Sequence, residues 1–586
     1  MERFWDKDNE TINTELNSVF KDMEASIKPR QQKYIKWYKL YNGIIDPENM
    51  REEGANLFIQ YTMPTIDTLI SRCLQALFRQ KPYVVVDPKK VQFKENAKYM
   101  QALIEDQIDN KINIVEKWYN MLLEVFLYGT SLPYTDWKLE KKTVKKWQEV
   151  IIPLLNIKMG RQAVKKEIVV YDAPFYEITD IFNVYVPSTA KEIRDAEPIA
   201  IKTYITPQEY KERLERGIYK DGEDLNDESN PLEEIEQVRL QKQNISDAPN
   251  KNRIKVINFY YNERTITQIN GKRIVRNEEN ASFSMEKPFD RVMWHPMPNE
   301  FWGKSLVDAV ESLQEELNTT RNQRIDNVSL VLNKLFKYNR NSDIDPNTIK
   351  SKPGHAIPVG DLRDIEAFDI PDVTASAYRE ESIIKQDIEF ITFVNDYAMG
   401  RTTPGSSDET ATAVRNKTAA SNINFNTVVM MLNATGLMPL YDKLIKLNYQ
   451  YFDRPESLPI PTDIGTEETV DLTWDKIQGD YGLIPANPNF ELPMSKEAKR
   501  ADLIGLLDTI SRVNPQVLQL INFRAYMKKL FELYDIKDYE ELLAPIMNPA
   551  SGQIPGQTPP QIAGPVGQPA NTQIPSDMGV EQNGFS

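Results

Sequence analysis

The sequence predicts a mixed α+β protein that is predominantly helical. Apolar residues recur at helical spacing through the first ~130 residues, which favours a helical N-terminal part. From Pro133 to about residue 205 the pattern changes to short β-rich runs such as VYVP and IAIKTYI. A third observation is a helical pattern over residues 304–334 that neither Gly nor Pro interrupts. We therefore expect a mixed α+β body followed by long helices.

Composition limits the kind of partner and compartment. The 586 residues carry a net charge of −15, which opposes a general grip on nucleic acid. The single cysteine, Cys73, lies in an apolar-periodic run, so we expect a buried thiol and no disulfide within the chain. The sequence opens with no signal-peptide pattern and has no apolar run near the ~18 residues of a membrane span. These features predict a soluble protein made in a reducing cytoplasm.

The stretch HPMPNEFWGKS, residues 295–305, raises the question of nucleotide binding. A phosphate-binding loop needs a glycine five positions before Gly-Lys-Ser, but Pro298 stands there, and Phe301 and Trp302 crowd the loop. We therefore interpret Gly303 as the end of a loop, Trp302 as a core residue and Ser305 as part of a helix N-terminus.

Other catalytic chemistry has little material. The two histidines, His295 and His355, have no partner at ligand spacing, which leaves no basis for a metal site or a Ser-His-Asp triad. The acidic run over residues 221–237 contains Gly, Asn, Ser and Pro, so it is interpreted as a solvated loop that leads into a helix. No catalytic, cofactor-binding or metal-binding residue is predicted, and the protein is not expected to be an enzyme.

The body elements follow from periodicity and turn signals. Helices are expected over residues 8–42, 58–80, 90–109 and 113–128. A hairpin is expected within residues 137–152, where exposed lysines would guard a sheet edge. Further strands are expected over residues 254–263, 265–276 and 282–294.

The helix over residues 304–334 has an apolar seam and a polar middle. Leu306, Val310, Leu313 and Leu317 make the seam, whereas residues 318–324 (NTTRNQR) are wholly polar. At about 1.5 Å per residue the helix would be about 45 Å long, too long for one small core. The polar middle must therefore meet water or a polar neighbour.

A small excursion and a returning helix come next. Turn signals at Asp345-Pro346 and Pro353-Gly354 predict a small β unit, and residues 334–352 have a local charge of +3 from five bases and two acids. A helix is expected over residues 374–398, with Ile384, Ile388 and Ile391 on one face. The pattern describes a stalk of two helices with a tip.

The rest of the chain is expected to return to the body. Residues 399–409 (MGRTTPGSSDE) form a short polar loop, and a long helix over about 410–452 should bend near Gly436 and Pro439. A strand-poor connector and two or three helices are expected over about 455–545. The Pro-, Gly- and Gln-rich tail that follows is expected to be disordered.

Four segments, in this order, resemble the portal, or head-to-tail connector, proteins of tailed double-stranded DNA bacteriophages. They are NLFIQYTMPTIDTLISRCLQALF, EVFLYGTSLPYTDW, DAPFYEITDIFNVYVPSTAKEI and FWGKSLVDAVESLQEELNTTRNQRIDN. The resemblance spans about residues 15–452. No single segment is decisive, but the ordered set is specific. This chain lacks a long C-terminal heptad region, which argues against an extended barrel beyond the crown.

The resemblance implies a dodecameric ring built on the portal fold. It implies the following segments: a wing (1–303), a stem helix (304–333), a clip (334–373), a returning stem helix (374–398), a tunnel loop (399–409), a long kinked wing helix with its connector (410–489), crown helices (490–545) and a disordered tail (546–586).

Candidate site residues follow from that mapping. The tunnel loop offers DNA-facing residues, which are Arg401, Thr402, Thr403, Ser406 and Ser407. The stem offers residues for the lumen or the subunit interface, which are Asn318, Arg321, Gln323 and Arg324. The clip offers partner-docking bases, which are Lys334, Lys337, Arg340, Lys350 and Lys352.

The implied function is a channel at one capsid vertex through which double-stranded DNA is packaged and ejected. Implied partners are the terminase large subunit, the tail adaptor or head-completion protein, and the major capsid and scaffolding proteins, with the protein located in the virion. Each DNA phosphate that a protein base neutralises adds affinity and therefore friction. A net acidic protein therefore suits a channel in which DNA must slide. Two alternatives stay open, namely a DNA-packaging enzyme such as an ATPase or nuclease, and a ring-forming virion scaffold without a DNA channel.

Overall fold

The computed structural model describes most of the chain. The described residues are 4–79, 81–152, 157–220, 230–245, 252–282, 284–333, 335–342, 344–349, 357–394, 424–461, 467–486 and 496–513, with residues 523, 526, 527, 530, 531 and 534. They fall into two compact units, residues 1–494 and 495–586. About half of the structure is helical and five sheets accompany the helices, which confirms the predicted α+β class.

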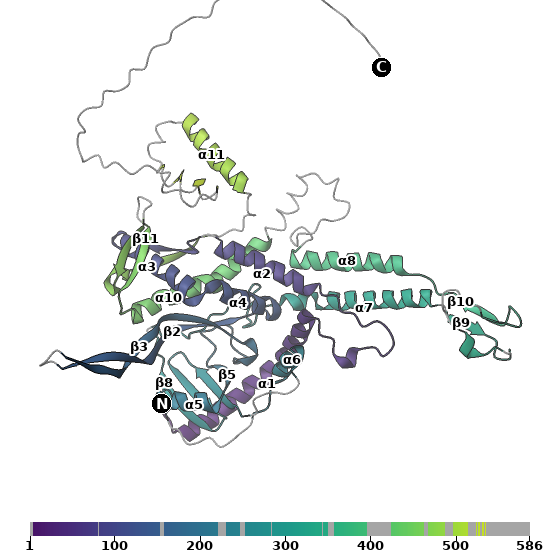
Figure 1. Ribbon diagram of the computed structural model, residues 1–586, viewed down its shortest axis with the longest axis horizontal. Coiled ribbons are helices and arrows are strands. Elements are labelled where there is room, and N and C mark those ends of the chain that lie inside the picture. The colour runs from purple at the N-terminus through teal and green to yellow at the C-terminus, as the bar shows by residue number, and fades with distance from the viewer. Residues whose placement is uncertain are drawn as a thin grey trace, which may run out of the picture. The chain divides into compact units, whose positions relative to one another are not determined.

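Four helices open the first unit (Figure 1). They are α1 (Asn9–Asn42), α2 (Thr62–Phe78), α3 (Lys94–Asp106) and α4 (Ile114–Tyr128). Asp8 caps α1 by accepting from the Thr11 N–H, and Gly43 ends it with a φ of 68°. The helix expected over residues 90–109 begins later and continues as a π-helix, η4 (Gln107–Ile112). Helical spacing therefore located all four helices, with errors at their ends.

A long two-stranded ribbon follows α4. It consists of β2 (Leu132–Ile152) and β3 (Ile157–Thr179), paired antiparallel. The prediction of a hairpin within residues 137–152 was wrong, because that stretch is a single strand of the ribbon. The lysine-rich run at residues 138–146 lies within this strand.

A five-stranded antiparallel sheet forms the next layer. Its strands, in spatial order, are β4 (Val184–Tyr185), β5 (Ile199–Ile205), β6 (Ile254–Tyr260), β7 (Arg264–Ile269) and β8 (Arg273–Glu279). Two short helices accompany it, α5 (Pro207–Glu215) and α6 (Glu234–Lys242).

Two strand predictions in this region need correction. The strand expected over residues 265–276 is two strands, because Asn270 and Gly271 both have positive φ and make the turn between them. The strand expected over residues 282–294 forms only isolated bridges, Ser131 with Val292 and Tyr134 with Phe289.

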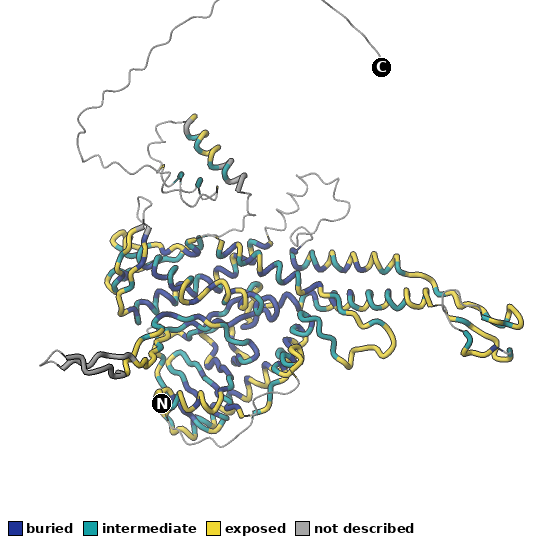
Figure 2. Tube along the Cα trace, in the orientation of Figure 1, coloured by how far each residue is buried: buried dark blue, intermediate teal, exposed yellow. Residues whose placement is uncertain are grey.

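The sheet lies between two apolar clusters. Ile257 and Phe259 of β6 face the main core, which also holds residues of the four N-terminal helices. Val256 and Ile254 of the same strand face a smaller cluster with Tyr210 of α5. Alternation along one strand therefore serves two cores. Buried residues gather where the helices meet this sheet (Figure 2).

Two long helices and a small hairpin leave the body. They are α7 (Leu306–Leu332), β9 (Leu335–Tyr338), β10 (Ile365–Phe368) and α8 (Thr374–Thr392). α7 and α8 lie side by side, with the β9–β10 hairpin at their outer end (Figure 1). α8 ends six residues before the predicted end at residue 398, since Phe393 adopts a left-handed conformation with a φ of 58°.

The chain then returns to the body through helix and strands. A π-helix, η8 (Asn433–Leu437), precedes α10 (Met438–Tyr451), so the irregularity includes Gly436, and Pro439 lies in the first turn of α10. The prediction of a strand-poor connector was wrong, because three strands follow: β11 (Glu456–Pro461), β12 (Glu467–Leu472) and β13 (Tyr481–Pro485). β11 pairs with β12, and β13 pairs with β1 (Val84–Pro88) near the start of the chain.

The described part of the second unit contains α11 (Lys496–Val513). There the Tyr526 hydroxyl donates to the Leu503 carbonyl at 2.8 Å. The predicted tail over residues 546–586 lies outside the described residues. Among the helices that the structure describes, none combines the length and apolar character that crossing a membrane requires.

Candidate functional site

The start of α7 fixes the helix pair to the body. Ser305 is the N-cap residue, and its Oγ accepts from the N–H of Asp308 at 3.2 Å and donates to the Leu127 carbonyl at 2.6 Å. Trp302 is buried in the main core just before the cap. The structural interpretation of this stretch is therefore confirmed, and α7 begins at a point held by α4.

The backbone of the same stretch has no room for a phosphate. The Gly303 N–H donates to Thr130 Oγ1 at 2.7 Å, and the Lys304 N–H donates to the His295 carbonyl at 3.0 Å. A Cβ at Gly303 would lie 2.5 Å from the carbonyl oxygen of Gly129, so the two backbone segments approach so closely that only glycine fits there. A phosphate-binding loop turns such N–H groups outward, whereas here they are already bonded within the chain.

An apolar seam holds α7 against α8. Val310 and Leu317 of α7 pack with Ile384 and Ile388 of α8, and all four are buried. Tyr61, just before α2, completes this cluster. Full burial of each such side chain stabilises the pair by about 1.5–3 kcal/mol.

Polar side chains at four-residue spacing occupy another face of α7. Gln314 is buried; its Oε1 accepts from the N–H of Thr62 at 3.1 Å, and its Nε2 donates to the Ile59 carbonyl at 2.7 Å. One turn further, Asn318 Oδ1 accepts from the Ile59 N–H at 2.9 Å. The amide side chains of α7 thus bond both backbone groups of Ile59.

The same arrangement continues along the helix. Asn322 accepts from the N–H of Leu57 at 2.8 Å and donates to its carbonyl at 3.0 Å. Asp326 accepts from the Ala55 N–H at 2.7 Å and from the Arg51 guanidinium at 2.9 Å. We call Gln314, Asn318, Asn322 and Asp326 the polar ladder, and residues 55–61 the extended segment. Every second residue of that segment faces α7, as in a β-strand.

The polar ladder accounts for Asn318 and Asn322 of the polar middle that the sequence left without a partner. The expected polar neighbour exists, and for this face it is the chain's own extended segment. The sequence did show polar residues at i, i+4, i+8 and i+12 on a helix with an apolar second face. That spacing is the signal by which Gln314, Asn322 and Asp326 would have been recognised.

A charged cluster lies between the two helices beside the ladder. Arg321 and Arg324 of α7 both contact Glu381 of α8, at 2.7 and 3.2 Å. The Arg324 guanidinium also lies over the Tyr378 ring, 3.9 Å from its centroid, and its side chain is only 7% exposed. Two guanidinium groups against one carboxylate leave a net positive charge between the helices.

The four stem candidates therefore differ in what they already contact. Asn318 bonds the extended segment, and Arg321 and Arg324 bond Glu381. Gln323 is exposed.

The tip has a more balanced charge than the +3 stretch suggested. Strand pairing places Lys337 opposite Glu366, and the Lys337 ammonium lies 4.4 Å from the centroid of the Phe368 ring. Arg340 is exposed beyond β9. Residues 334–373 together contain six bases and seven acids. The other clip candidates, Lys334, Lys350 and Lys352, lie outside the described residues.

The tunnel-loop candidates also lie outside the described residues. They are Arg401, Thr402, Thr403, Ser406 and Ser407.

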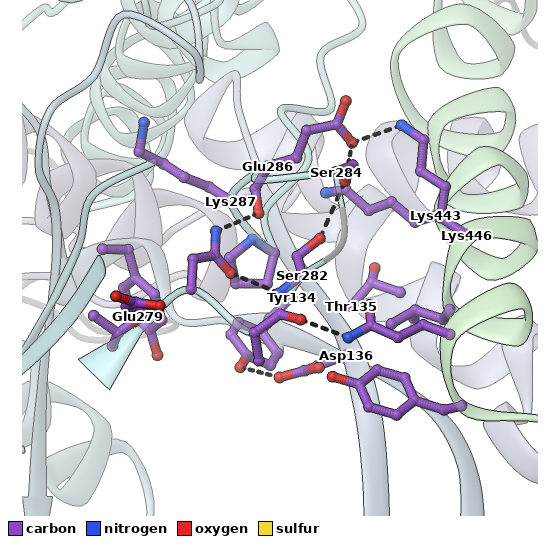
Figure 3. A pocket seen from close by; sticks show the side chains of 18 of the residues that line it. Tyr134, Thr135, Asp136, Glu279, Ser282, Ser284, Glu286, Lys287, Lys443 and Lys446 are labelled. Carbon is purple, nitrogen blue, oxygen red and sulfur yellow. Dashed lines mark hydrogen bonds and ion pairs between the residues drawn. The ribbon is translucent and has the colours of Figure 1, made fainter. Parts of the chain in front are cut away.

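A separate cavity of about 110 Å³ lies between β2, the segment after β8, and α10 (Figure 3). The Lys446 ammonium contacts Glu286 at 2.7 Å, and the same carboxylate accepts from Ser284 at 3.2 Å. Tyr134 donates to Asp136 at 2.8 Å. These side chains satisfy one another, so the cavity resembles a polar seam between packed elements rather than a reactive centre.

Buried charge near this cavity also has a structural partner. The Lys287 ammonium donates to Asn262 Oδ1 at 2.7 Å and to the Ile193 carbonyl at 3.1 Å. Burial lowers the pKa of Lys287 to about 8, against the opposing charge of Glu197. Across the described ranges of the chain, no group of three or more His, Cys, Asp and Glu residues could hold a metal ion.

Comparison with known proteins identifies a protein family. A family model described as "Phage SU10 portal protein" matches residues 148–575, which is well over half of the chain. No curated protein matches the sequence.

Proposed function

This chain belongs to the phage SU10 portal protein family, and from that premise we propose that copies of it form a ring-shaped channel at one capsid vertex. Double-stranded DNA passes through this channel during packaging and ejection. The observation that supports it most directly is the family match, which includes α7, the β9–β10 tip and α8. Such rings in this family are homo-oligomers, and a dodecamer is the number we propose.

In this proposal α7 and α8 are the stem, the β9–β10 hairpin belongs to the clip, and residues 399–409 form the tunnel loop. The body is the wing, and residues 490–545 form the crown. The loop residues Arg401, Thr402, Thr403, Ser406 and Ser407 face the DNA, and Gln323 contributes to the contact between neighbouring stems. A heterologous ring contact suits such a helix, because each copy meets its two neighbours through different surfaces.

The role is structural and needs no chemical step. Family membership favours it over a packaging ATPase or nuclease. The bonded N–H groups of Gly303 and Lys304 argue in the same direction. We therefore expect neither the wild type nor Lys304→Ala to bind nucleotide. Saturable ATP binding that this substitution removes would favour the enzyme instead.

Electron microscopy of the purified full chain tests the assembly. We expect closed rings with a central hole. A well-folded monomer at micromolar concentration would contradict the proposal, and a closed ring without a hole would favour the scaffold alternative.

The clip is proposed to dock the terminase large subunit and later the tail adaptor. Lys337 is a poor probe, because Lys337→Glu would remove its contact with Phe368 and place two carboxylates opposite each other at Glu366. Arg340→Glu combined with Lys350→Glu avoids that pairing. It should leave the ring intact and weaken partner binding, more strongly at low salt.

The matched control is Lys211→Glu on α5, an exposed base far from the tip along the chain. Binding of each partner is measured against immobilised rings at low ionic strength. Equal affinities for wild type, control and tip variant would show that these bases serve only solubility. The remaining proposed partners are the major capsid and scaffolding proteins, and the proposed location is the virion.

A further inference from the structure

The outer part of the β2–β3 ribbon stands apart from the sheets of the body. Its two strands pair only with each other among the described strands, and the ribbon extends away from the body (Figure 1). The base is anchored, since Trp137 stacks on Tyr451 and Asp172 contacts Arg454 at 3.4 Å. Beyond Lys138 the described side chains are mostly exposed. A two-stranded ribbon of this kind is marginally stable without a further surface to pack against.

Charge separates this ribbon from the rest of the chain. Residues 137–171 contain nine lysines and arginines and three glutamates, a net charge of +6. That leaves −21 for the other residues of a chain whose total is −15. The exposed lysines among the described side chains are Lys138, Lys141, Lys142, Lys145, Lys165 and Lys166.

Apolar side chains are interleaved with these lysines. The register pairs Val144 with Lys166 and Ile168 with Lys142, so these four residues share one face of the ribbon. Val144 is 41% exposed and Ile168 is 46% exposed. Val170, at the bulge between the strands, and Leu139 are each more than half exposed, although alternation places Leu139 on the opposite face from Val144. The face therefore offers apolar contact flanked by positive charge.

We propose that this face of the ribbon docks onto an acidic surface of a second copy of the chain. The net −21 outside the ribbon makes a second copy the complementary partner. Burial of Val144 and Ile168 against it would supply the third layer that a two-stranded ribbon needs. The inference rests on the proposed ring, in which each copy meets its neighbour through two different surfaces.

The composition of the face favours a protein partner over DNA. Lysines alone would be enough to contact DNA phosphates. The exposed valines and isoleucine would not be buried by such contacts and would not stabilise them. A protein surface rewards both kinds of side chain, because it buries apolar area and offers carboxylates at the rim.

Two double variants of the full chain distinguish docking onto a second copy from a contact with DNA. Val144→Thr with Ile168→Thr keeps β-branched residues and removes apolar surface. Lys142→Glu with Lys166→Glu keeps the apolar pair and reverses the charge. Matched controls are Val85→Thr, an exposed position on β1, and Lys211→Glu on α5. Thermal unfolding and circular dichroism establish that each variant is folded.

Assembly is measured by mass photometry as the concentration at which half the chains are in rings, and DNA binding by anisotropy of a labelled duplex. Both ribbon variants should raise the half-assembly concentration about tenfold, while both controls leave it unchanged. DNA binding that falls only in the charge variant, with assembly unchanged, would overturn the proposal in favour of a DNA contact. Unchanged assembly and unchanged DNA binding in both variants would also overturn it.

Failure of the ring itself is distinguished by cross-linking. A photoreactive residue at position 144 of otherwise wild-type protein should yield covalent pairs of this chain. If wild type stays monomeric in the assembly assay, the proposed channel is wrong. The cross-link then tests by itself whether the ribbon contacts a second copy. Pairs of copies would support the docking, and products with DNA only, or none, would sink it.

Discussion

Gly129 shows how tightly the start of α7 crosses the end of α4. Its φ is +86°, and an added Cβ would lie 2.3 Å from the Gly303 carbonyl oxygen. Gly217 has a similar φ of +70° but nothing within 4 Å. Gly129→Ala should therefore lower the free energy of unfolding well beyond the ~1 kcal/mol of left-handed strain expected for Gly217→Ala. Urea unfolding of both variants checks this, and equal losses would mean that the crossing can relax.

Glu124 of α4 couples the fold to pH. Burial, followed by the charge of Asp180, raises the pKa of Glu124 to about 8, although Ser131 donates to it at 2.7 Å. The folded chain thus binds this proton more tightly than the unfolded chain, in which the ordinary value of 4.5 applies. The stabilisation is complete below that value and is lost as pH rises towards about 8, by about 1.4 kcal/mol per unit.

Glu124→Gln removes this titration. We expect the variant to have a flatter dependence of unfolding free energy on pH than wild type, with the largest gain near pH 8. Glu116→Gln, an exposed change on the same helix, is the control. Urea unfolding at about pH 5 and about pH 8 measures the slope. Parallel slopes for wild type and Glu124→Gln would contradict the assignment.

At the scale of single elements, the polar ladder attaches α7 to the extended segment. Asn322→Ala removes two hydrogen bonds to Leu57 and should cost about 1–2 kcal/mol. Its exposed neighbour Gln323 provides the control, Gln323→Ala. Hydrogen exchange at the Leu57 amide should accelerate only in Asn322→Ala. Exchange that accelerates equally in both would show that the amide was protected by something other than the ladder.

Elements defined by local pattern were predictable from the sequence. α1, α7 and β5 follow from apolar spacing, and Ser305 marked the start of α7 as an N-cap. The strands β11 and β13 were missed because prolines at residues 459, 461 and 485 argued against strands, and because the partner of β13 lies near the start of the chain. The hairpin prediction was wrong because both of its strands were placed within residues 137–152, whereas this whole stretch belongs to β2 and pairs with β3.

At the scale of the whole molecule, the candidate site was only partly predictable. Segment order was enough to recognise the family, because several ordered stretches together are more specific than any motif. The contacts of Asn318 could not be foreseen, since its partner Ile59 lies 259 residues away and is bonded through its main chain, which leaves no side-chain signature. The contacts of Asn322 with the main chain of Leu57 were hidden for the same reason.

The C-terminal tail gives a prediction at this scale. A chain that ends at Ile546 loses a segment rich in Pro, Gly and Gln, a composition with little apolar surface to bury. It should keep the thermal unfolding midpoint and the assembly of the full chain. Differential scanning calorimetry and electron microscopy check both. A lower midpoint or the loss of rings would show that the tail packs against the folded chain.

The polar ladder also joins two elements whose residues advance by different distances along their axes. Four helical residues advance about 6.0 Å, whereas two extended residues advance about 6.6 Å. Across its three intervals the mismatch grows to about 2 Å, comparable to the difference between a hydrogen bond and no bond. In a longer ladder the side chains of α7 would no longer reach their partners in the extended segment. A shift of α7 by one turn, about 5.4 Å, would break all the hydrogen bonds of the ladder together. Under an axial load, the helix and the segment before α2 must therefore shift together or release together.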